Sequence, residues 1–364
     1  SSVRFNFTIY HMFLALNEIR HEKMRYGLIV SVISLVSFLI FILSALSLGL
    51  ANQNTAAIDS WKTTSALMTK NANGNMGQSL MTKNQLDSTS KSDDTAQVGI
   101  SPTNVKRTNS STSQSVQFIG VNFNEYIFKD LTVTMGHLPK NKSEIVISDK
   151  LNDLKIGDRV YIGLDNNSFK IVGKVSDAQY NMAPVIYGSI NNWAVIKGVG
   201  NQFYGSGLIS KEKLPTKNLS SDLVIYDKST FLSKLPGYAA QNTTFAFMIV
   251  FLIIISLVVV TIFLYILTIQ KLPNLAVLRA QGIPSKYLLK NTFGETLLIM
   301  ITSVVLGLIL TTISGILIPA GVPMYFNIPL IAGVGIGIVI TGLIGSLIPM
   351  KIIAKIDPVS AIGG

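Results

Sequence analysis

Few side chains in this sequence have the types and spacing that enzyme chemistry needs. The 364 residues include no cysteine, so no thiolate nucleophile, thiolate metal site or disulfide can form. No paired carboxylates, metal-spaced ligands or nucleophile elbow stand in a setting that favours catalysis. The chain also has no G-x-x-x-x-G-K-[ST] phosphate loop, so it cannot be an ATPase by that mechanism. We therefore predict that it is not an enzyme, has no intrinsic cofactor and binds no catalytic metal.

The most informative polar segment is Gln270 to Asn291, between two long apolar stretches. Asn274 can cap a short helix over residues 275–281, and Gly282 can close it. Pro284 prevents this helix from continuing, and Ser285 can start the next one.

The predicted short helix carries both apolar and basic side chains. Leu275 and Leu278 stand beside Arg279 and Ala280, a combination that suits a groove in a cytoplasmic partner. The alternative is a solvated loop that only sets topology. On the first interpretation, the partner-coupling residues are Leu275, Leu278, Arg279, Ala280 and Gly282.

The elements that must position this loop are membrane helices. The chain is 48% hydrophobic and only 13% charged, with mean hydropathy +0.45, which is too apolar for an ordinary soluble domain. About 20 helical residues cross the ~30 Å of hydrocarbon in a bilayer. Four stretches meet that length: Gly27 to Leu50, Phe245 to Ile269, Thr296 to Ile318 and Leu330 to Met350.

The distribution of positive charge predicts the orientation in the plasma membrane. Lys and Arg cluster before the first stretch, between the second and third, and after the fourth, whereas residues 319–329 have none. By the positive-inside rule, both termini and residues 270–291 are cytoplasmic, and residues 51–242 and the short loop 319–329 are outside. Because these charges flank apolar runs, the net charge of +11 is not interpreted as nucleic-acid binding.

The N-terminal residues predict an anchor and not a cleaved signal peptide. Residues 12–26 form an amphipathic pattern that can lie in the cytoplasmic interface, and no convincing small-residue cleavage site follows the first stretch. Residues 1–11 fit no expected pattern, so we expect the native start at Met12. Residues 351–364 are the predicted cytoplasmic tail.

The outside segment 51–242 divides by composition. Residues 84–115 are rich in Ser, Thr, Asn, Asp and Gln, which predicts a polar, weakly ordered excursion. Before it, Thr55 to Leu80 can continue the first helix outward. After it, residues 144–148, 159–163 and 169–173 have strand patterns, with a hairpin turn between the last two. The predicted fold is four transmembrane α-helices, one plus three, with a large α+β extracellular domain after the first.

Three short motifs in this topology resemble a known family. They are Leu14-Ala-Leu-Asn-Glu-Ile19 before the first span, Leu278-Arg-Ala-Gln-Gly282 after the second, and Asp357-Pro-Val-Ser-Ala-Ile362 at the C-terminus. Together with the one-plus-three arrangement, they resemble FtsX/MacB-type ABC transporter permeases. The resemblance implies a homodimer in which the loop helix of each copy docks on a separate ATP-binding subunit, two copies in all, with ATP and Mg on that partner.

Within that family, the outside segment looks most similar to haem-efflux permeases of Gram-positive bacteria. The residues that carry this similarity are Gln53-Asn-Thr-Ala-Ala-Ile-Asp-Ser-Trp61 and Ala178-Gln-Tyr-Asn-Met-Ala-Pro-Val-Ile-Tyr187. The resemblance implies that haem is taken from the membrane and expelled.

Axial ligation of haem needs His, Met, Tyr or Cys. The candidates near the membrane are Met68, Met76, Met81, Tyr180, Met182, Tyr187 and Tyr238, whereas His137 is expected to be exposed in a turn. For any one of these methionines and tyrosines, core packing is the competing interpretation.

Two other functions share the same fold. The permease could carry no substrate and instead control an extracellular partner such as a cell-wall hydrolase, or it could export peptides or antibiotics. The five glycines of the fourth span, Gly333, Gly335, Gly337, Gly342 and Gly345, are interpreted as contacts within the helix bundle.

Overall fold

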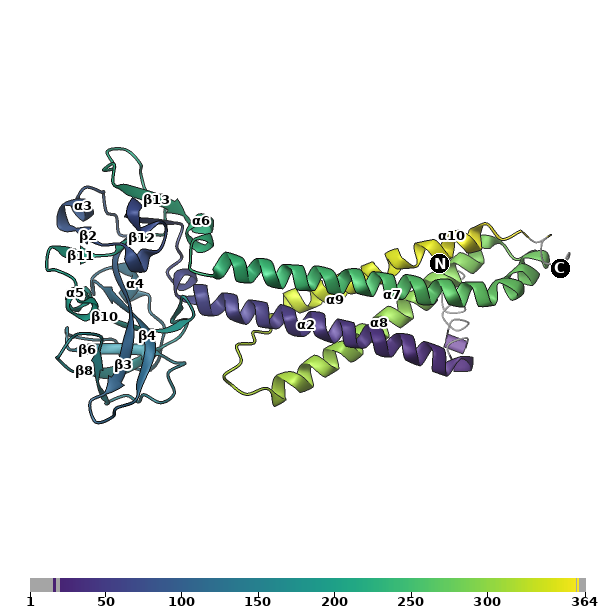
Figure 1. The fold of residues 1–364 in the computed structure, drawn as a ribbon, viewed down its shortest axis with the longest axis horizontal. Coiled ribbons are helices and arrows are strands. Elements are labelled where there is room, and N and C mark those ends of the chain that lie inside the picture. The colour runs from purple at the N-terminus through teal and green to yellow at the C-terminus, as the bar shows by residue number, and fades with distance from the viewer. Residues whose placement is uncertain (1–15, 18–19, 358, 360–364) are drawn as a thin grey trace, which may run out of the picture. The chain divides into compact units, whose positions relative to one another are not determined.

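The computed structural model describes residues 16–17, 20–357 and 359, and it divides into two compact units (Figure 1). The sheet domain comprises Gly49–Asn242, and the helical unit comprises the described residues before and after it. Helices α2 (Lys23–Ser60) and α7 (Tyr238–Ala280) each contribute residues to both units. Residues 12–15 and 18–19 of the predicted interfacial helix, and residues 358 and 360–364 of the predicted tail, lie outside the described residues.

Four helices in the described residues are long and apolar enough to cross a membrane. They are α2, α7, α8 (Ser285–Leu317) and α9 (Ile328–Gly345), the last continued by α10 (Leu347–Ala354) after a break at Ser346. The predicted fold class, with one span before the sheet domain and three after it, is confirmed. The 38 residues of α2 reach about 57 Å at 1.5 Å per residue, so α2 extends well beyond the predicted span 27–50.

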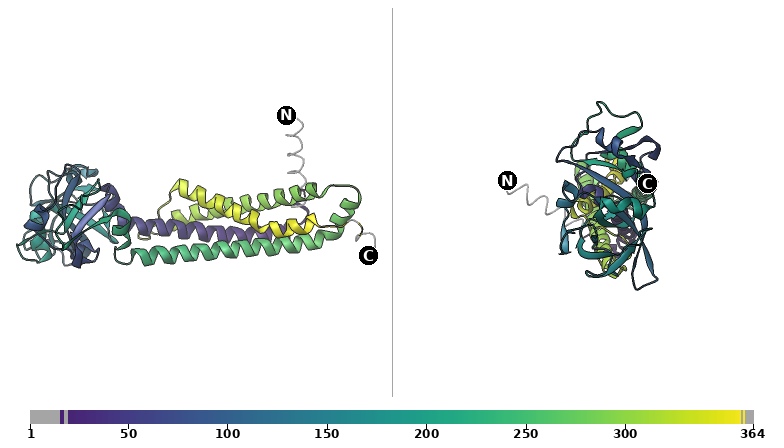
Figure 2. Two further views of the ribbon diagram at one scale, coloured as in Figure 1. Left: turned by 90° about the horizontal axis from the view of Figure 1, so that it is seen from above. Right: turned by 90° about the vertical axis from the view of Figure 1, so that its left-hand side faces the viewer.

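The four long helices lie alongside one another and share one apolar core (Figure 2). Ile33 and Ile40 of α2, Leu264 of α7, Met300 of α8 and Ile338 of α9 all belong to it. The outward faces carry exposed large apolar side chains, most densely on α7. Such faces are stable against lipid and not against water.

Glycines of α9 allow close approach to neighbouring helices. A Cβ at Gly342 would lie 2.3 Å from the Met300 sulfur, and one at Gly345 would lie 3.0 Å from the Thr261 hydroxyl oxygen. Gly335 faces Val304 and Phe41 in the same way, at 3.3 and 3.6 Å. The predicted packing role is therefore confirmed for these three glycines, but Gly333 and Gly337 have no neighbour within 4 Å of a Cβ position.

The prediction of a loop over residues 270–291 with a separate helix capped by Asn274 is wrong. Helix α7 continues without interruption through Pro273 to Ala280. Its last turns pack on α8 and α10 through an apolar cluster that includes Ala276, Leu288 and Ile353. This packing overrides the local cap and proline signals.

The predicted end of that helix is correct. Gly282 has φ +87, the left-handed conformation that glycine adopts without a Cβ penalty. Its N–H donates to the Arg279 carbonyl at 3.1 Å, and the Ile283 N–H donates to the Leu278 carbonyl at 3.1 Å. Pro284 is the N-cap of α8, which starts at Ser285 as predicted. The segment is thus a helix–turn–helix closed by a Schellman-type turn.

The sheet domain is built on one 11-stranded sheet in the order β13-β1-β12-β3-β4-β10-β6-β8-β5, with β7 against β3 and β8 and β9 against β10. A separate pair joins β2 and β11. The strands are β1 (Ser65–Thr69), β2 (Met81–Thr82), β3 (Thr95–Arg107), β4 (Ser113–Val121), β5 (Val133–Gly136), β6 (Glu144–Ser148), β7 (Arg159–Ile162), β8 (Phe169–Val175), β9 (Gln179–Tyr180), β10 (Ala183–Ser189), β11 (Phe203–Gly205), β12 (Gly207–Ser210) and β13 (Leu223–Asp227). Short helices connect them: α3 (Lys83–Asp87), α4 (Tyr126–Lys129), α5 (Trp193–Lys197) and α6 (Lys228–Ser233).

Both faces of the sheet carry apolar cores, because successive residues of a strand point to opposite faces. Ile119 of β4 belongs to the core that also includes the end of α2, α4 and α6. Its neighbour Phe118 belongs to the other core, which includes Trp193 of α5. The sheet is therefore buried between helices on both sides.

The prediction of a weakly ordered segment over residues 84–115 is wrong. Residues 95–107 form β3, the longest strand, which pairs with β4, β12 and β7. The polar composition hides a period-2 pattern in which Ala96, Val98 and Ile100 face one core. Of the polar residues between them, Gln97 is 9% exposed and donates to the Tyr204 carbonyl at 2.8 Å.

The other strand predictions are confirmed. Residues 144–148, 159–162 and 169–175 are β6, β7 and β8, and β7 pairs antiparallel with β8 as a hairpin. The predicted outward continuation of the first helix over Thr55 to Leu80 holds only to Ser60, because residues 65–69 form β1 in the middle of the sheet.

A partly buried ion pair and a hydrogen bond from the same ammonium join three helices of the helical unit. The Lys271 ammonium on α7 lies 3.4 Å from a Glu295 carboxylate oxygen on α8. The same ammonium donates to the Tyr26 hydroxyl on α2 at 3.1 Å. Glu295 is 6% exposed and Tyr26 is 2% exposed. Sequence analysis treated Lys271 only as a topology marker and did not find this pair.

We expect Glu295→Gln to destabilise the helical unit by about 2 kcal/mol, because a partly buried ammonium loses its charged partner. The measurement is unfolding of the purified chain followed by far-UV circular dichroism. The control is Glu22→Gln, since Glu22 lies 3.5 Å from Arg25 in a pair whose side chains are 38% and 53% exposed. An exposed pair of this kind contributes less than about 1 kcal/mol. Equal losses in both variants would contradict a structural role for Glu295.

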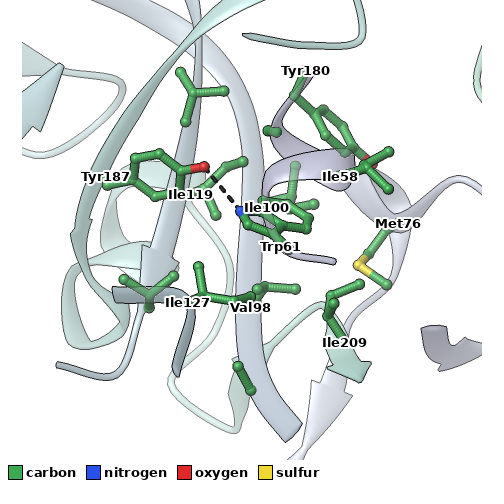
Figure 3. Packing of buried hydrophobic residues seen from close by; sticks show 14 of the residues in the cluster. Ile58, Trp61, Met76, Val98, Ile100, Ile119, Ile127, Tyr180, Tyr187 and Ile209 are labelled. Atoms are coloured by element: carbon green, nitrogen blue, oxygen red, sulfur yellow. Dashed lines mark hydrogen bonds between the residues drawn. The ribbon is translucent and has the colours of Figure 1, made fainter. Parts of the chain in front are cut away.

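A hydrogen bond between two aromatic side chains connects Trp61, which directly follows α2, to strand β10 of the sheet. The Trp61 indole N–H donates to the Tyr187 hydroxyl at 3.0 Å, and both side chains are almost fully buried (Figure 3). Since the two tryptophans of the chain, Trp61 and Trp193, are both buried in the sheet domain, their fluorescence reports on this domain alone.

We expect Tyr187→Phe to lower the free energy of unfolding of the sheet domain by about 1–2 kcal/mol, because the buried indole N–H loses its acceptor. Thermal unfolding followed by tryptophan fluorescence measures this loss. Tyr204→Phe is the matched control, since Tyr204 is 49% exposed, and it should change stability by less than about 0.5 kcal/mol. An unchanged free energy of unfolding in Tyr187→Phe would show that this hydrogen bond does not stabilise the sheet domain.

Candidate functional sites

The first candidate site is the turn between α7 and α8. Pro273, Val277, Ala280 and Gln281 are exposed along one side of the last turns of α7, and Val277 is 49% exposed. Residues three and four apart lie on the same face of a helix. This side, which we call the turn face, is therefore a short surface with an apolar residue at its centre.

The predicted coupling residues divide between this face and the interior. Leu275 and Leu278 are half-buried against the cluster formed by Ala276, Leu288 and Ile353, so they hold the turn on the bundle. The Arg279 guanidinium donates to the Ile283 carbonyl at 3.2 Å, which fixes the turn. Of the predicted set, Ala280 and Gly282 are exposed.

Sequence analysis did not select Val277. The missed signal is the helical spacing from Pro273 through Val277 to Gln281, which becomes visible once residues 270–280 are treated as one helix.

Four of the predicted haem candidates are core residues of the sheet domain. Met68 and Met76 are fully buried, and Tyr180 and Tyr187 are 2% and 1% exposed. They share one core with Trp61, whose ring lies 6.2 Å from that of Tyr180 (Figure 3). In this arrangement they pack against protein and touch no open surface.

The candidate Met81 and the residue His137 take different positions. Met81 is fully buried in a separate small cluster. His137 is exposed, with Nδ1 2.8 Å from the Leu138 carbonyl oxygen, as expected for a turn residue.

Burial also affects the acidity of the two buried phenols. Burial raises the pKa of Tyr180 and of Tyr187 well above the usual range, so both stay neutral. The Tyr180 hydroxyl has no hydrogen-bond partner among the described residues. A neutral phenol in an apolar core is a weak metal ligand, because the phenolate form is the one that binds iron strongly.

The remaining candidates, Met182 and Tyr238, lie in a second candidate site, where α2 and α7 enter the sheet domain. Met182 is 45% exposed and Tyr238 is partly exposed. The Asn54 side-chain amide joins their segments. It donates to the Met182 sulfur at 3.4 Å and to the side-chain amide oxygen of Gln241 at 3.2 Å.

The backbone also holds the Met182 loop against α2. The N–H groups of Asn181 and Met182 donate to the carbonyls of Asn54 and Gln53, both at 3.1 Å. Met182 has φ +69, a conformation that non-glycine residues adopt rarely. Because Tyr238 precedes Gln241 by three residues in α7, the two share a helix face. We call Asn54, Met182, Tyr238 and Gln241 the entry patch.

The entry patch offers a thioether, a phenol and the Gln241 amide at a partly accessible surface, and no acid–base pair. Such a set can ligate or orient a ligand but does not cleave bonds. The Asn54 side chain is 1% exposed, and its oxygen has no hydrogen-bond partner among the described residues.

Comparisons with known proteins agree with this architecture. Residues 246–358 match the family described as FtsX-like permease C-terminal. The chain is 27% identical over 360 residues to the putative hemin transport system permease protein HrtB of Staphylococcus haemolyticus, covering 97% of this chain and 99% of that protein. The protein of the same description from Staphylococcus epidermidis is 26% identical over 356 residues, with 97% and 99% covered.

Two solved structures are similar to part of the chain. The extracellular domain of the noncanonic ABC-type transporter YknZ from Gram-positive bacteria is 15% identical, with TM-score 0.30, and the match covers 44% of this chain and 85% of that one. A domain of a putative permease protein from Porphyromonas gingivalis is 9% identical, with TM-score 0.27, and the match covers 43% and 75%. Residues 246–358 are thus similar to an FtsX-like permease domain, and nearly the whole chain is similar to proteins described as putative hemin transport system permeases.

Proposed function

We propose that this permease exports haem from the membrane and is driven by a separate ATP-binding subunit, present in two copies. The observation that carries this proposal is similarity over 97% of the chain to proteins described as hemin transport permeases. The similarity covers the sheet domain as well as the family domain at residues 246–358. ATP and Mg bind the partner subunit and not this chain.

The turn face is the proposed docking surface for the ATP-binding subunit. It lies at the end of α7, and its inner side is fixed by Leu275, Leu278 and the Arg279–Ile283 hydrogen bond. A rigid, short helical end with an exposed apolar residue suits a groove on a partner. In this proposal the turn and both termini are on the cytoplasmic side of the plasma membrane, which the positive-inside rule supports.

The permease acts as a homodimer in this proposal. The exposed apolar faces of α2 and α7 are available both to lipid and to a second copy. Two copies present two turn faces, one for each ATP-binding subunit.

The entry patch is the proposed point of contact with haem. Haem is a flat apolar molecule with two carboxylates and an iron that accepts thioether and phenolate ligands. Met182 supplies an exposed thioether, and Tyr238 supplies a phenol that is partly exposed. Gln241 is half-buried, and its side-chain N–H groups can donate to a propionate. Asn54 holds the Gln241 side chain in place through its own hydrogen bond.

We expect Met182→Ala to weaken haem binding by the purified permease at least tenfold and to shift the Soret band, since the iron loses a thioether. Tyr238→Phe should give a smaller loss. Absorption titration with haemin in nanodiscs measures both. The matched control is Met135→Ala, because Met135 is 59% exposed on β5, outside the entry patch. Identical spectra and affinities in all these variants would exclude the entry patch as the haem contact.

A deletion strain separates haem export from the other two functions that share this fold. Cells that lack the permease should lose haem tolerance. Unchanged haem tolerance, with either altered antibiotic susceptibility or capture of a cell-wall hydrolase, would replace haem export by one of the other two functions.

We expect Val277→Glu to weaken association with the ATP-binding subunit at least tenfold, which corresponds to about 1.4 kcal/mol, because it puts a charge at the centre of an apolar contact. Co-purification and stimulated ATP hydrolysis measure the coupling. Lys351→Glu is the control: it adds negative charge at an exposed residue of α10 that is not part of the turn face. If Val277→Glu bound the ATP-binding subunit as tightly as the wild type does, the turn face would be excluded as the docking surface.

A further inference from the structure

Strand β3 has a gap in its ladder on one edge. On that edge it pairs with β12 through residues 95–98 and with β7 through residues 105–107. Within the described part of the chain, no strand covers the residues between these two pairings, although β4 pairs with β3 along the opposite edge. Pro102, which has no N–H to leave unpaired, stands in the middle of the gap.

Other groups satisfy the backbone at both ends of this gap. The Trp193 indole N–H donates to the Ile100 carbonyl at 3.1 Å, and the Ser206 hydroxyl accepts the Ile100 N–H at 2.8 Å. At the far end, the Gly163 N–H donates to the Asn104 carbonyl at 3.0 Å. The hydrogen bonds to Ile100 and Asn104 therefore stabilise β3 at both ends of the gap without a neighbouring strand.

A half-open cavity of about 540 Å³ occupies the gap. Its floor is residues 101–106 of β3, and its walls come from the end of β7 and from α5. Leu164, Ile196 and Val199 give the walls apolar surface, and Ser101, Thr103 and Tyr161 add hydroxyl groups. Pockets that hold small molecules have this size and this mixture of apolar surface and a few polar groups.

Two lysines give the cavity a positive charge. Lys197 is half-buried in the wall, where its ammonium donates to the carbonyls of Gly77 at 2.6 Å and Ile100 at 3.4 Å. Lys106 is exposed at the rim. The lining includes no Asp or Glu, and neither lysine has a carboxylate partner among the described residues. Burial lowers the pKa of Lys197, as expected for a cation that lacks an anion beside it.

We propose that this cavity binds an anionic amphipathic small molecule, whose acid group lies against Lys197 and Lys106 and whose apolar body covers Leu164, Ile196 and Val199. An acid group would supply the missing countercharge, and the apolar wall would exclude water from it. The gap is too short to add a peptide strand, because only the edge between the two existing pairings is open and Pro102 cannot donate. This site is separate from the entry patch and does not depend on haem export.

The test uses the full-length permease in phosphatidylcholine nanodiscs and isothermal titration with 2-naphthoate, an aromatic carboxylate. We expect saturable binding, and at least tenfold weaker binding of the neutral analogue 2-naphthamide. Lys106→Gln should weaken 2-naphthoate binding at least threefold. Ser113→Trp should abolish it, since Ser113 is an exposed lining residue and an indole there fills the cavity.

The control is Lys91→Gln, which removes an exposed lysine of the same domain that does not line the cavity and should leave binding unchanged. Lys197 is not used as the primary variant, because its hydrogen bonds to two carbonyls also support the fold. An unchanged far-UV circular dichroism spectrum shows that each variant is folded, because Ser113→Trp adds a third tryptophan to the sheet domain. Absence of binding in the wild type, equal affinity for the acid and the amide, or unchanged binding in folded Ser113→Trp would overturn the proposal.

Discussion

The contact between Lys271, Glu295 and Tyr26 is the constraint on which the arrangement of the helical unit depends. The partly buried ammonium, the buried carboxylate and the buried phenol fix three helices at one level, because any slip of one helix past another would separate the two charges and break the hydrogen bond. Lys271 stands two residues before Pro273, where the turn face begins. The position of the turn face on the bundle is therefore set by an electrostatic contact, and the apolar cluster around Ala276 and Ile353 only has to hold its orientation.

The sheet domain uses membrane helix residues for its own core. Ala57, Ile58 and Trp61 are the last buried residues of α2 and its immediate continuation, yet they pack in the same core as the sheet strands. This explains why α2 continues beyond the length that a bilayer requires. It also explains why the most aromatic part of the outer sequence, around Trp61, Tyr180 and Tyr187, is a packing centre: the bonds and stacking that fill it leave no room for a ligand.

How much could be predicted from the sequence depended on the range of the interactions involved. The four spans and the end of α7 were predictable, because they depend on neighbouring residues alone: long apolar runs form the spans, and Gly282 ends the helix. Residues 95–107 were misjudged because polar residues such as Gln97 gain their partners only from other strands. Asn274 was assigned a cap because the packing of Ala276 on α10 is not visible locally. The entry patch needed Asn54 and Gln241 to meet, and the pairing of Lys271 with Glu295 needed two helices to be aligned.

The hydrogen bond from Asn54 to Gln241 has a consequence for how the polypeptide chain assembles. Its partners are 187 positions apart in the sequence, and closing a flexible loop of that length has a large entropic cost. Since a chain folds in the order of its synthesis, the sheet domain can fold before the last helices are made. Once folded, it holds its two ends together, so the second span enters the membrane beside the first as if the connection were a short hairpin turn.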